Sequence, residues 1–576
     1  MIKYFVLTIL SAISLVSISA QTTLSGRVRN AVTGEYILGA NVIIENNTSG
    51  VSTNLYGFYS LSLPEGEHSI KYSFIGFKSI TVKVDMSGSM VKDVDLAPKT
   101  VEVMGANIIG AKGENTNSTE LGSTVVSIET IKSLPALFGE VDVLKVIQLL
   151  PGIQSSGEGN TGFYVRGGGP DQNLILLDNA AVYNASHLFG FFSVFNADAI
   201  SNVGVHKGTM PARYGGRISS VLDISMREGN RREHKVNGGV GLISARFTVE
   251  GPIKKDTSSF IISARRTYID ILTRPFAKGT SAEGSGYYFY DLNAKINHRF
   301  SEKDEVYLSG YFGRDVFSFK STDAGFGTSI PWGNATASLR WNHLFNDQLF
   351  LNMNVSYTDY NFAFEGEQEE FAFGFNSGIE DWSYKSTMNY YPNSRHEIKG
   401  GVEYVFHQFM PTDFFARNGD TPIEFGVSEV TNSHESSAFI ESDFEINEFL
   451  KIYSGLRYSD FRHVGPFTRY SSDYTDLDSA VFGKGELVKR YGGFEPRISA
   501  RIKTGTYSSI KAGFSENYQY VHLASLSAST APTDVWLPSS DLVKPQWGRQ
   551  WSAGYFTDLG EDRSWEASIE GYYKSL

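Results

Sequence analysis

A glycine-rich segment in the first third of the chain has the spacing of a dinucleotide-binding loop. Gly157, Gly159 and Gly162 fit the pattern G-x-G-x-x-G, whose glycines let a backbone approach a pyrophosphate group. That chemistry requires a strand before the glycines and a helix after them. Here the apolar periodicity predicts the opposite order, with a helix before and a strand after. We therefore interpret the segment as a plain loop.

Acidic residues are the next candidates for chemistry, because carboxylates bind hard cations. Asp473, Asp476, Asp478 and Glu486 could hold calcium, but their spacing is not that of an EF-hand loop. The run from Glu365 to Glu370 could attract a cation or a metal chelate, yet such runs are typical of solvated loops. The sequence predicts no metal site and no cofactor.

The 11 histidines are scattered and show no paired-ligand spacing. The sequence also contains no G-x-S-x-G element or other nucleophile arrangement, so we expect no catalytic residues and no enzyme activity. His187 stands out because it lies beside Tyr183, Asn184 and Phe189 in a segment without a clear period. These four residues are our candidates for contact with a bound solute.

Composition indicates the fold class in which these residues must be held. The chain has 40 Phe, 31 Tyr and 57 Gly but only 17 Pro, which favours a mainly β protein. A formal net charge of −12 argues against a nucleic-acid partner, whose phosphates require basic patches. With no cysteine, the chain has no disulfide and no lipoprotein anchor. Its stability must come from burial and hydrogen bonds.

Residues 1–20 have a charged start, an apolar stretch and a small-residue end, which predicts a secretory signal peptide. A single-pass anchor is the alternative. The Ser-rich end favours cleavage, so we expect the mature chain to begin near Gln21.

Residues 22–98 alternate short apolar segments with turn residues, which predicts a β-sandwich of about seven strands. Strands are expected near Leu24–Arg29, Ala40–Glu45, Gly57–Leu63 and His68–Phe74. The segment resembles the carboxypeptidase regulatory-like domain, a transthyretin-like sandwich. The resemblance is carried by Gly26, Thr33-Gly34, Leu38–Val42, Gly57–Tyr59 and Gly76-Phe77. In that family the module is not catalytic.

Residues 99–230 mix helical and strand periods, which predicts a small α+β domain. Val141, Leu144, Ile147 and Leu150 share one helical face, and Pro151-Gly152 ends that helix. Strands are expected at Gly162–Arg166, Asn173–Asp178, Val203–His206 and Ser219–Ser225.

From residue 235 to 576 the chain becomes a series of roughly fourteen strands in which apolar and polar residues alternate. In Glu397–His407, the apolar face holds Ile398, Val402, Tyr404 and Phe406, and the charged face holds Glu397, Lys399, Glu403 and His407. The alternation persists over roughly ten residues, longer than an average strand of about five to six. Short turns such as Ser301–Asp304 and Phe345–Gln348 alternate with longer breaks such as Arg462–Tyr491.

This pattern is typical of an antiparallel transmembrane β-barrel with its charges facing the lumen. A soluble propeller or sandwich array is the alternative, but strand length and the export signal favour the membrane. Barrels of about 22 strands are plugged, so we expect the α+β domain to be the plug. We also expect a truncated barrel that lacks about eight strands relative to that number.

The segment Phe163–Asn184 then has a structural explanation. Gly167, Gly168 and Gly169 allow a tight turn and close backbone approach between two strands. Arg166 would be an unpaired charge inside a barrel unless acidic lumenal residues meet it.

The motifs around this segment resemble the plug of TonB-dependent outer-membrane receptors of the Bacteroidota type. They are LLPGIQSSG, VRGG, LILLDNAAVYN, HLFGFFSVFNADAI and VGVHKGTMPARYGGRISSVLDISMREG. Within them, the positions that we assign to the structural motif of the plug are Arg166, Gly167, Gly168, Asp178, Tyr214 and Gly215. The plug lacks the longer signature of the starch-utilisation branch, which argues against a glycan substrate.

The resemblance implies energised uptake of a scarce solute, such as a siderophore-like metal chelate, across the outer membrane. It implies the TonB-ExbB-ExbD complex and outer-membrane lipid as partners, with the sandwich in the periplasm. Val101, Glu102, Val103 and Met104 lie where the family keeps its TonB box, and an extended segment could add to the partner's sheet edge. A plain interdomain linker is the alternative for these residues. A binding or adhesion protein without transport is the alternative function.

Overall fold

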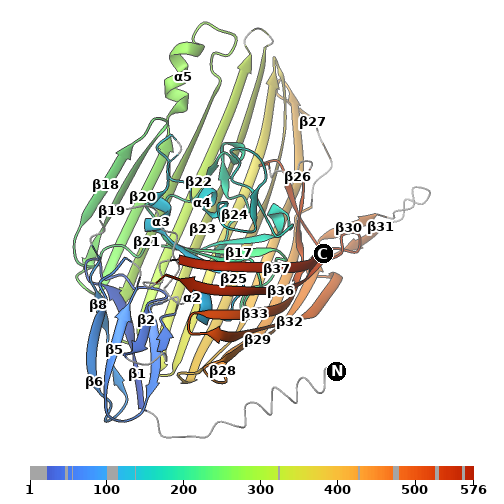
Figure 1. Cartoon of the computed structure of the whole chain (residues 1–576). Coiled ribbons are helices and arrows are strands. Elements are labelled where there is room, and N and C mark those ends of the chain that lie inside the picture. The colour runs from blue at the N-terminus through green and yellow to red at the C-terminus, as the bar shows by residue number, and fades with distance from the viewer. Residues whose placement is uncertain are drawn as a thin grey trace.

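The computed structural model describes residues 22–45, 50–54, 56–74, 76–99, 114–136, 138–321, 323, 325–423, 425, 429–470, 479–525, 531–560 and 565–576. Within these ranges the chain forms an N-terminal sandwich, a central α+β domain and a long antiparallel sheet, which we call the wall (Figure 1). The predicted signal peptide and Val101–Met104 lie outside the described residues.

The sandwich consists of two four-stranded sheets, β4-β1-β7 with β8 beside β1, and β3-β2-β5-β6. Their strands are β1 (Thr22–Asn30), β2 (Asn41–Ile44), β3 (Gly50–Ser52), β4 (Phe58–Leu63), β5 (Glu67–Ser73), β6 (Ile80–Asp85), β7 (Met90–Val91) and β8 (Val94–Leu96). Leu24, Leu61 and Tyr72 lie in its core with no exposed surface. The expected strands are present, and β1 and β4 are buried on both faces along most of their length.

The central domain is built on a five-stranded sheet with the order β13-β12-β17-β16-β9. Its elements are α2 (Glu114–Asn117), β9 (Ser123–Ser127), α3 (Ile128–Ser133), α4 (Val143–Ile147), β10 (Ile153–Ser155), β11 (Phe163–Val165), η1 (Pro170–Gln172), β12 (Asn173–Leu177), β13 (Ala180–Ala181), β14 (Ser186–His187), η2 (Leu188–Gly190), β15 (Phe192–Ser193), β16 (Ile200–His206) and β17 (Ser220–Met226). The loop from Gly157 to Gly162 joins β10 to β11, so the glycine pattern opens no helix.

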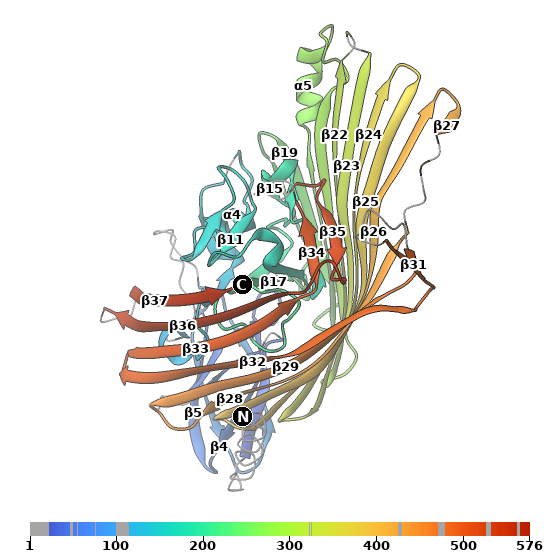
Figure 2. The ribbon, with the colours of Figure 1, turned by 90° about the vertical axis from the view of Figure 1, so that its right-hand side faces the viewer.

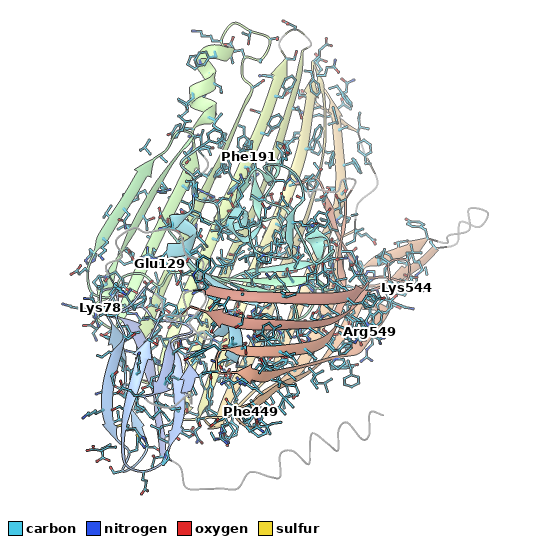
Figure 3. The ribbon with its side chains drawn as sticks, viewed as in Figure 1. Lys78, Glu129, Phe191, Phe449, Lys544 and Arg549 are labelled. Atoms are coloured by element: carbon cyan, nitrogen blue, oxygen red, sulfur yellow. The ribbon has the colours of Figure 1, made fainter. Side chains whose placement is uncertain are left out.

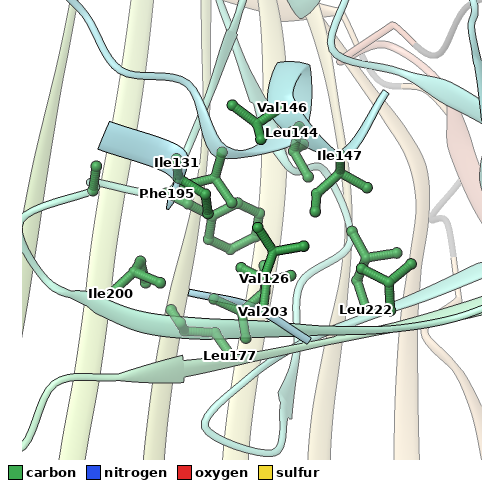
Figure 4. Close-up of a cluster of buried hydrophobic side chains, with 14 of the residues drawn as sticks. Val126, Ile131, Leu144, Val146, Ile147, Leu177, Phe195, Ile200, Val203 and Leu222 are labelled. Atoms are coloured by element: carbon green, nitrogen blue, oxygen red, sulfur yellow. The ribbon is translucent and has the colours of Figure 1, made fainter. Parts of the chain in front are cut away.

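Helices and sheet of this domain enclose one apolar core, shown in Figure 4. Leu144 and Ile147 of α4 point into it, as the predicted helical face requires, and meet Val203 of β16 and Leu222 of β17. Asp142 is the N-cap of α4, and its side chain accepts a hydrogen bond from the Lys145 backbone N–H. The core is supplied by the domain itself, with Tyr311 added from the wall.

The wall is a 16-stranded antiparallel sheet whose main strand order follows the sequence from β18 to β37. Its strands are β18 (Lys235–Val240), β19 (Ser244–Lys254), β20 (Ser258–Thr267), β21 (Gly286–Arg299), β22 (Asp304–Ser321), β23 (Phe326–Asn346), β24 (Leu349–Gln368), β25 (Phe371–Asn393), β26 (His396–Asn418), β27 (Thr421–Ile423), β28 (Thr431–Glu445), β29 (Leu450–Val464), β32 (Leu487–Gly505), β33 (Ser508–Gln519), β36 (Gln546–Leu559) and β37 (Trp565–Ser575). Three further elements lie in its loops: helix α5 (Ile269–Ala277), hairpin β30 (Phe467–Tyr470) with β31 (Ser479–Phe482), and hairpin β34 (Val521–Ala524) with β35 (Val535–Pro538).

The wall curves around the central domain, and Figure 2 shows that domain on its concave side. Among the described strands, β18 and β37 end the order and do not pair with each other, so the wall is open. In the helices that the structure describes, none is long and apolar enough to cross a membrane.

The two faces of the wall have opposite character, as the alternation predicts. Trp382, Ile440 and Ile569 on the convex face are 51%, 51% and 79% exposed. Their neighbours Asp381, Glu441 and Glu570 point to the concave face and toward the central domain. An apolar outer face and a polar inner face suit a sheet whose outside contacts lipid.

Candidate functional site

The central domain is held to the wall mainly by polar side chains on the concave face. Figure 3 shows side chains filling the space between the two parts, with Phe191 and Glu129 labelled along the central domain. Buried charges are costly unless they are paired. The positions of the buried ion pairs therefore show where the central domain is fixed to the wall.

The turn after β11 is as tight as the three glycines predict. Gly167 has φ +80°, and the Val165 and Gly168 backbones exchange hydrogen bonds of 3.1 and 2.9 Å across it. A Cβ on Gly168 would lie 2.3 Å from the Ser219 hydroxyl oxygen. A larger residue at 168 would therefore push this turn away from the strand that it packs on.

Arg166 leaves this turn with φ +48° and reaches the last strand of the wall. Its guanidinium donates to Glu570 Oε2 at 2.8 Å and to the Ser552 hydroxyl at 3.1 Å, and it lies 5.0 Å from the Tyr572 ring. The acidic partner expected from the sequence is thus supplied by β37. The pair fixes the glycine turn to this edge of the wall.

His187 is buried between two carboxylates of the wall. Its Nε2 lies 2.8 Å from Asp291 of β21, its Nδ1 lies 2.6 Å from Asp315 of β22, and its ring stacks on Phe289 at 4.0 Å. Burial by itself would lower the pKa of His187, but the two carboxylates outweigh it and raise the pKa to about 9. At neutral pH the His187 imidazolium is therefore a buried cation that holds the central domain to the two carboxylates of the wall.

Other buried pairs join the two parts on this side. Arg265 of β20 lies 3.4 Å from Glu140 and donates to the Ser193 carbonyl, and Lys295 of β21 lies 2.8 Å from Asp178. These partners were not singled out from the sequence. Period two shows that Lys295 points inward, but it does not show which carboxylate of the central domain faces it.

Asp178 and Tyr214, two of the predicted motif residues, make local contacts as well. Asp178 accepts a hydrogen bond from the Met226 backbone N–H at 3.0 Å, and the Tyr214 hydroxyl donates to Asp223 at 2.6 Å. Burial would raise the pKa of Asp178, but Lys295 and Arg340 lower it below its ordinary value. A Cβ on Gly215 would lie 2.3 Å from Arg457 Nε, so the absence of a side chain lets this arginine approach.

The four candidate solute contacts do not share one environment. His187 is 1% exposed and lies between two carboxylates of the wall, whereas Asn184 is buried and lines one of the cavities that Tyr183 also lines. Phe189 is 40% exposed. Tyr183 donates to Asp381 of β25 and lines two cavities along the central domain.

The sandwich docks beneath the wall at the junction of residues 228–232. Glu35 accepts hydrogen bonds from the Glu228 and Gly229 backbone N–H groups at 2.7 and 3.1 Å, and Arg232 pairs with Asp95. Phe58 stacks on Phe350 of β24 at 5.7 Å. The sandwich thereby touches both the central domain and the turns of the wall.

Comparison with known proteins agrees with this division. Residues 24–108 match the model of the CarboxypepD_reg-like domain, and residues 98–221 match the TonB-dependent Receptor Plug Domain. The chain therefore has the domain order of TonB-dependent receptors of the Bacteroidota type. We call its central domain the plug, and the family together with the two-faced sheet places it in the outer membrane.

Among curated proteins, the chain is similar to TonB-dependent receptor SusC of Bacteroides thetaiotaomicron, at 28% identity over 237 residues. The match covers 38% of this chain and 22% of the length of that relative. The match therefore spans only about a fifth of the length of that curated relative.

Solved structures match over most of the chain. They include the siderophore receptor PirA from Acinetobacter baumannii (TM-score 0.55, 17% identity, 82% of this chain and 72% of that one). The copper transporter OprC matches with TM-score 0.56 and 12% identity over 78% of this chain and 72% of its own. The alcaligin receptor FauA from Bordetella pertussis matches with TM-score 0.54 and 14% identity over 81% and 74%. At these identities the likeness establishes the fold.

Proposed function

We propose that the receptor takes up a scarce solute across the outer membrane, with energy delivered through TonB and its ExbB-ExbD partners. The observation that carries this proposal is a plug with an apolar core, seated on the concave face of a lipid-facing sheet and fixed there by buried ion pairs. Such a plug blocks passage until work is done on it, because breaking each buried pair costs several kcal/mol.

A siderophore-like metal chelate is our first candidate solute. Relatives of the same fold are siderophore receptors and a copper transporter by name, which supports the choice without deciding it. No observation favours a binding or adhesion protein without transport.

Deletion of Val101–Met104 tests the proposal. The assay measures the part of the uptake of radiolabelled ferric chelates that a protonophore abolishes. We expect the deletion to abolish this energised uptake, because TonB would lose its strand partner. Binding of the same chelates at the cell surface should persist. Deleting Gly483–Glu486, the four residues between β31 and β32, is the control for a general loss of assembly. Unchanged uptake in the Val101–Met104 deletion would place the TonB contact elsewhere or return us to the non-transporting alternative.

A further inference from the structure

Three cavities follow the plug, and neighbouring ones share lining residues. The upper cavity lies between the plug and the hairpin β34–β35, the middle one between the plug and the wall, and the lower one among sandwich, plug and wall. The upper cavity of about 50 Å³ and the middle cavity of about 80 Å³ share Tyr183 and Arg217. The middle cavity and the lower cavity of about 380 Å³ share Asn179 and Lys385. The cavities therefore follow one another along the plug.

Strand β25 shows that this succession runs along the wall. Asp381, Ser383 and Lys385 line the middle cavity, and Lys385, Thr387 and Asn389 line the lower one. Every second residue of a strand points to the same face, so these side chains form one inward row of roughly 26 Å. Neighbouring β24 contributes Ser356 to the middle cavity and Asn352 to the lower cavity in the same order.

Resting on the proposed uptake function, we propose that the solute crosses between the plug and strands β24–β26, along this row, and that Tyr183 and Lys385 close it. The Tyr183 hydroxyl donates to Asp381 where the upper and middle cavities meet. Lys385 donates to the Arg213 carbonyl at 2.6 Å and to Glu403 at 3.3 Å where the middle and lower cavities meet. Each closure is a side-chain hydrogen bond between plug and wall, from Tyr183 of the plug in one case and from Lys385 of the wall in the other. Rotation of that side chain would open the closure.

The sizes of the cavities indicate a closed state. A water molecule occupies about 30 Å³ of liquid, whereas pockets for small-molecule ligands span about 300–1,000 Å³. The upper and middle cavities thus hold only a few waters, and the lower one is large enough for a small solute. Passage requires the first two to widen, which is what movement of Tyr183 and Lys385 would achieve.

The chemistry of the row favours a polar, hydrogen-bonding solute. The middle cavity is lined by charges of both signs, including Arg217, Glu403, Glu435 and Arg457, together with the hydroxyls of Ser356 and Thr358. An apolar solute would have to displace water from all of these groups without replacing their hydrogen bonds. A polar solute can exchange one set of hydrogen bonds for another as it moves.

The part of the plug that faces β20–β22 is fixed differently. At β20–β22, His187, Arg265 and Lys295 make direct buried ion pairs between plug and wall. Because such pairs are expensive to break, this side is suited to anchor the plug while the β24–β26 side opens. The sandwich contributes Tyr36 and Tyr56 to the lower cavity, so it borders the exit of the proposed path.

The chain has no cysteine, which allows a direct test by thiol labelling. Ser356→Cys and Ser383→Cys place a thiol on the path, and Ser263→Cys places one against Asn196 of the plug on the anchored side. The probe is a charged, membrane-impermeant methanethiosulfonate added to cells with and without a protonophore. A buried thiol reacts in proportion to the population of the open state.

We expect energised cells to label Ser356→Cys and Ser383→Cys about tenfold faster than protonophore-treated cells, with Ser263→Cys unaffected, as for an opening shifted by about 1.4 kcal/mol. Acceleration confined to Ser263→Cys, or equal at all three positions, would overturn the path while leaving energised uptake in place. No acceleration at any position would instead contradict the proposed function.

Gate variants provide a second measurement. Tyr183→Phe and Lys385→Met should raise labelling of Ser356→Cys without energy by roughly tenfold, because each removes a buried hydrogen bond that holds the closed state. Tyr287→Phe is the control, since the Tyr287 hydroxyl joins wall and plug on the anchored side by accepting a hydrogen bond from the Leu188 backbone N–H at 2.7 Å. Equal labelling in the gate variants and the control would exclude Tyr183 and Lys385 as the closures.

Discussion

The docking of the plug should depend on pH through His187. Its pKa is about 9 in the docked plug and about 6.5 when the side chain is free in water. Because the docked value is the higher one, the extra stability is fully present below pH 6.5 and is lost as pH rises through 9. The difference corresponds to about 3 kcal/mol of docking free energy.

The groups that face His187 come from three strands of the wall and from the plug. Asp291 and Asp315 contact the imidazole, Tyr287 donates to Asp315, and Arg265 pairs with Asp291 and Glu140. Replacement of His187 by Gln removes the titrating group and keeps a hydrogen-bond donor. The variant should be less stably docked at pH 6 and should lose the pH dependence that His187 contributes.

Hydrogen exchange of the β14 and β15 amides measures this local opening. Wild type and His187→Gln are compared at matched pH between 6 and 10, so that intrinsic exchange and the titration of other groups such as Lys207 cancel. We expect the gap in opening free energy between the two proteins to shrink by about 3 kcal/mol across this range. If the difference in opening free energy between the two proteins stays constant with pH, protonated His187 does not stabilise docking of the plug.

Three further perturbations test the plug contacts. Arg166→Ala should loosen the edge at β37 by about 2 kcal/mol, since Glu570 loses its partner but keeps some solvent contact. Increased antibiotic leakage and plug proteolysis would report it, with the exposed Arg266→Ala as control, and no increase would count against the pairing. Gly168→Ala should destabilise the plug by about 1–3 kcal/mol through the Ser219 clash, whereas Gly88→Ala, which meets nothing within 4 Å, should not change its melting. Phe350→Ala should weaken sandwich docking by about 3 kcal/mol, seen as faster proteolytic separation of the sandwich, and unchanged cleavage would mean that Phe58 contributes little there.

The sequence by itself determined the three-part organisation and the two faces of each long strand. Period two placed Glu403 and Glu441 inside and Val402 and Ile440 outside, because a charge facing lipid costs roughly 2–4 kcal/mol at the bilayer centre. It also indicated that Arg166 needs an acidic partner and that Gly168 marks a close approach. These are local or energetic requirements that any correct fold has to satisfy.

Only the tertiary structure decided which residues meet. Arg166 pairs with Glu570, which lies 404 positions later in the sequence. His187 lies between Asp291 and Asp315, although no local pattern links the histidine to either carboxylate. The alignment of the three cavities depends on the register of β24 with β25 and on how the plug is seated against them. A strand pattern fixes the face on which a side chain lies, but its partner is set by the packing of distant segments.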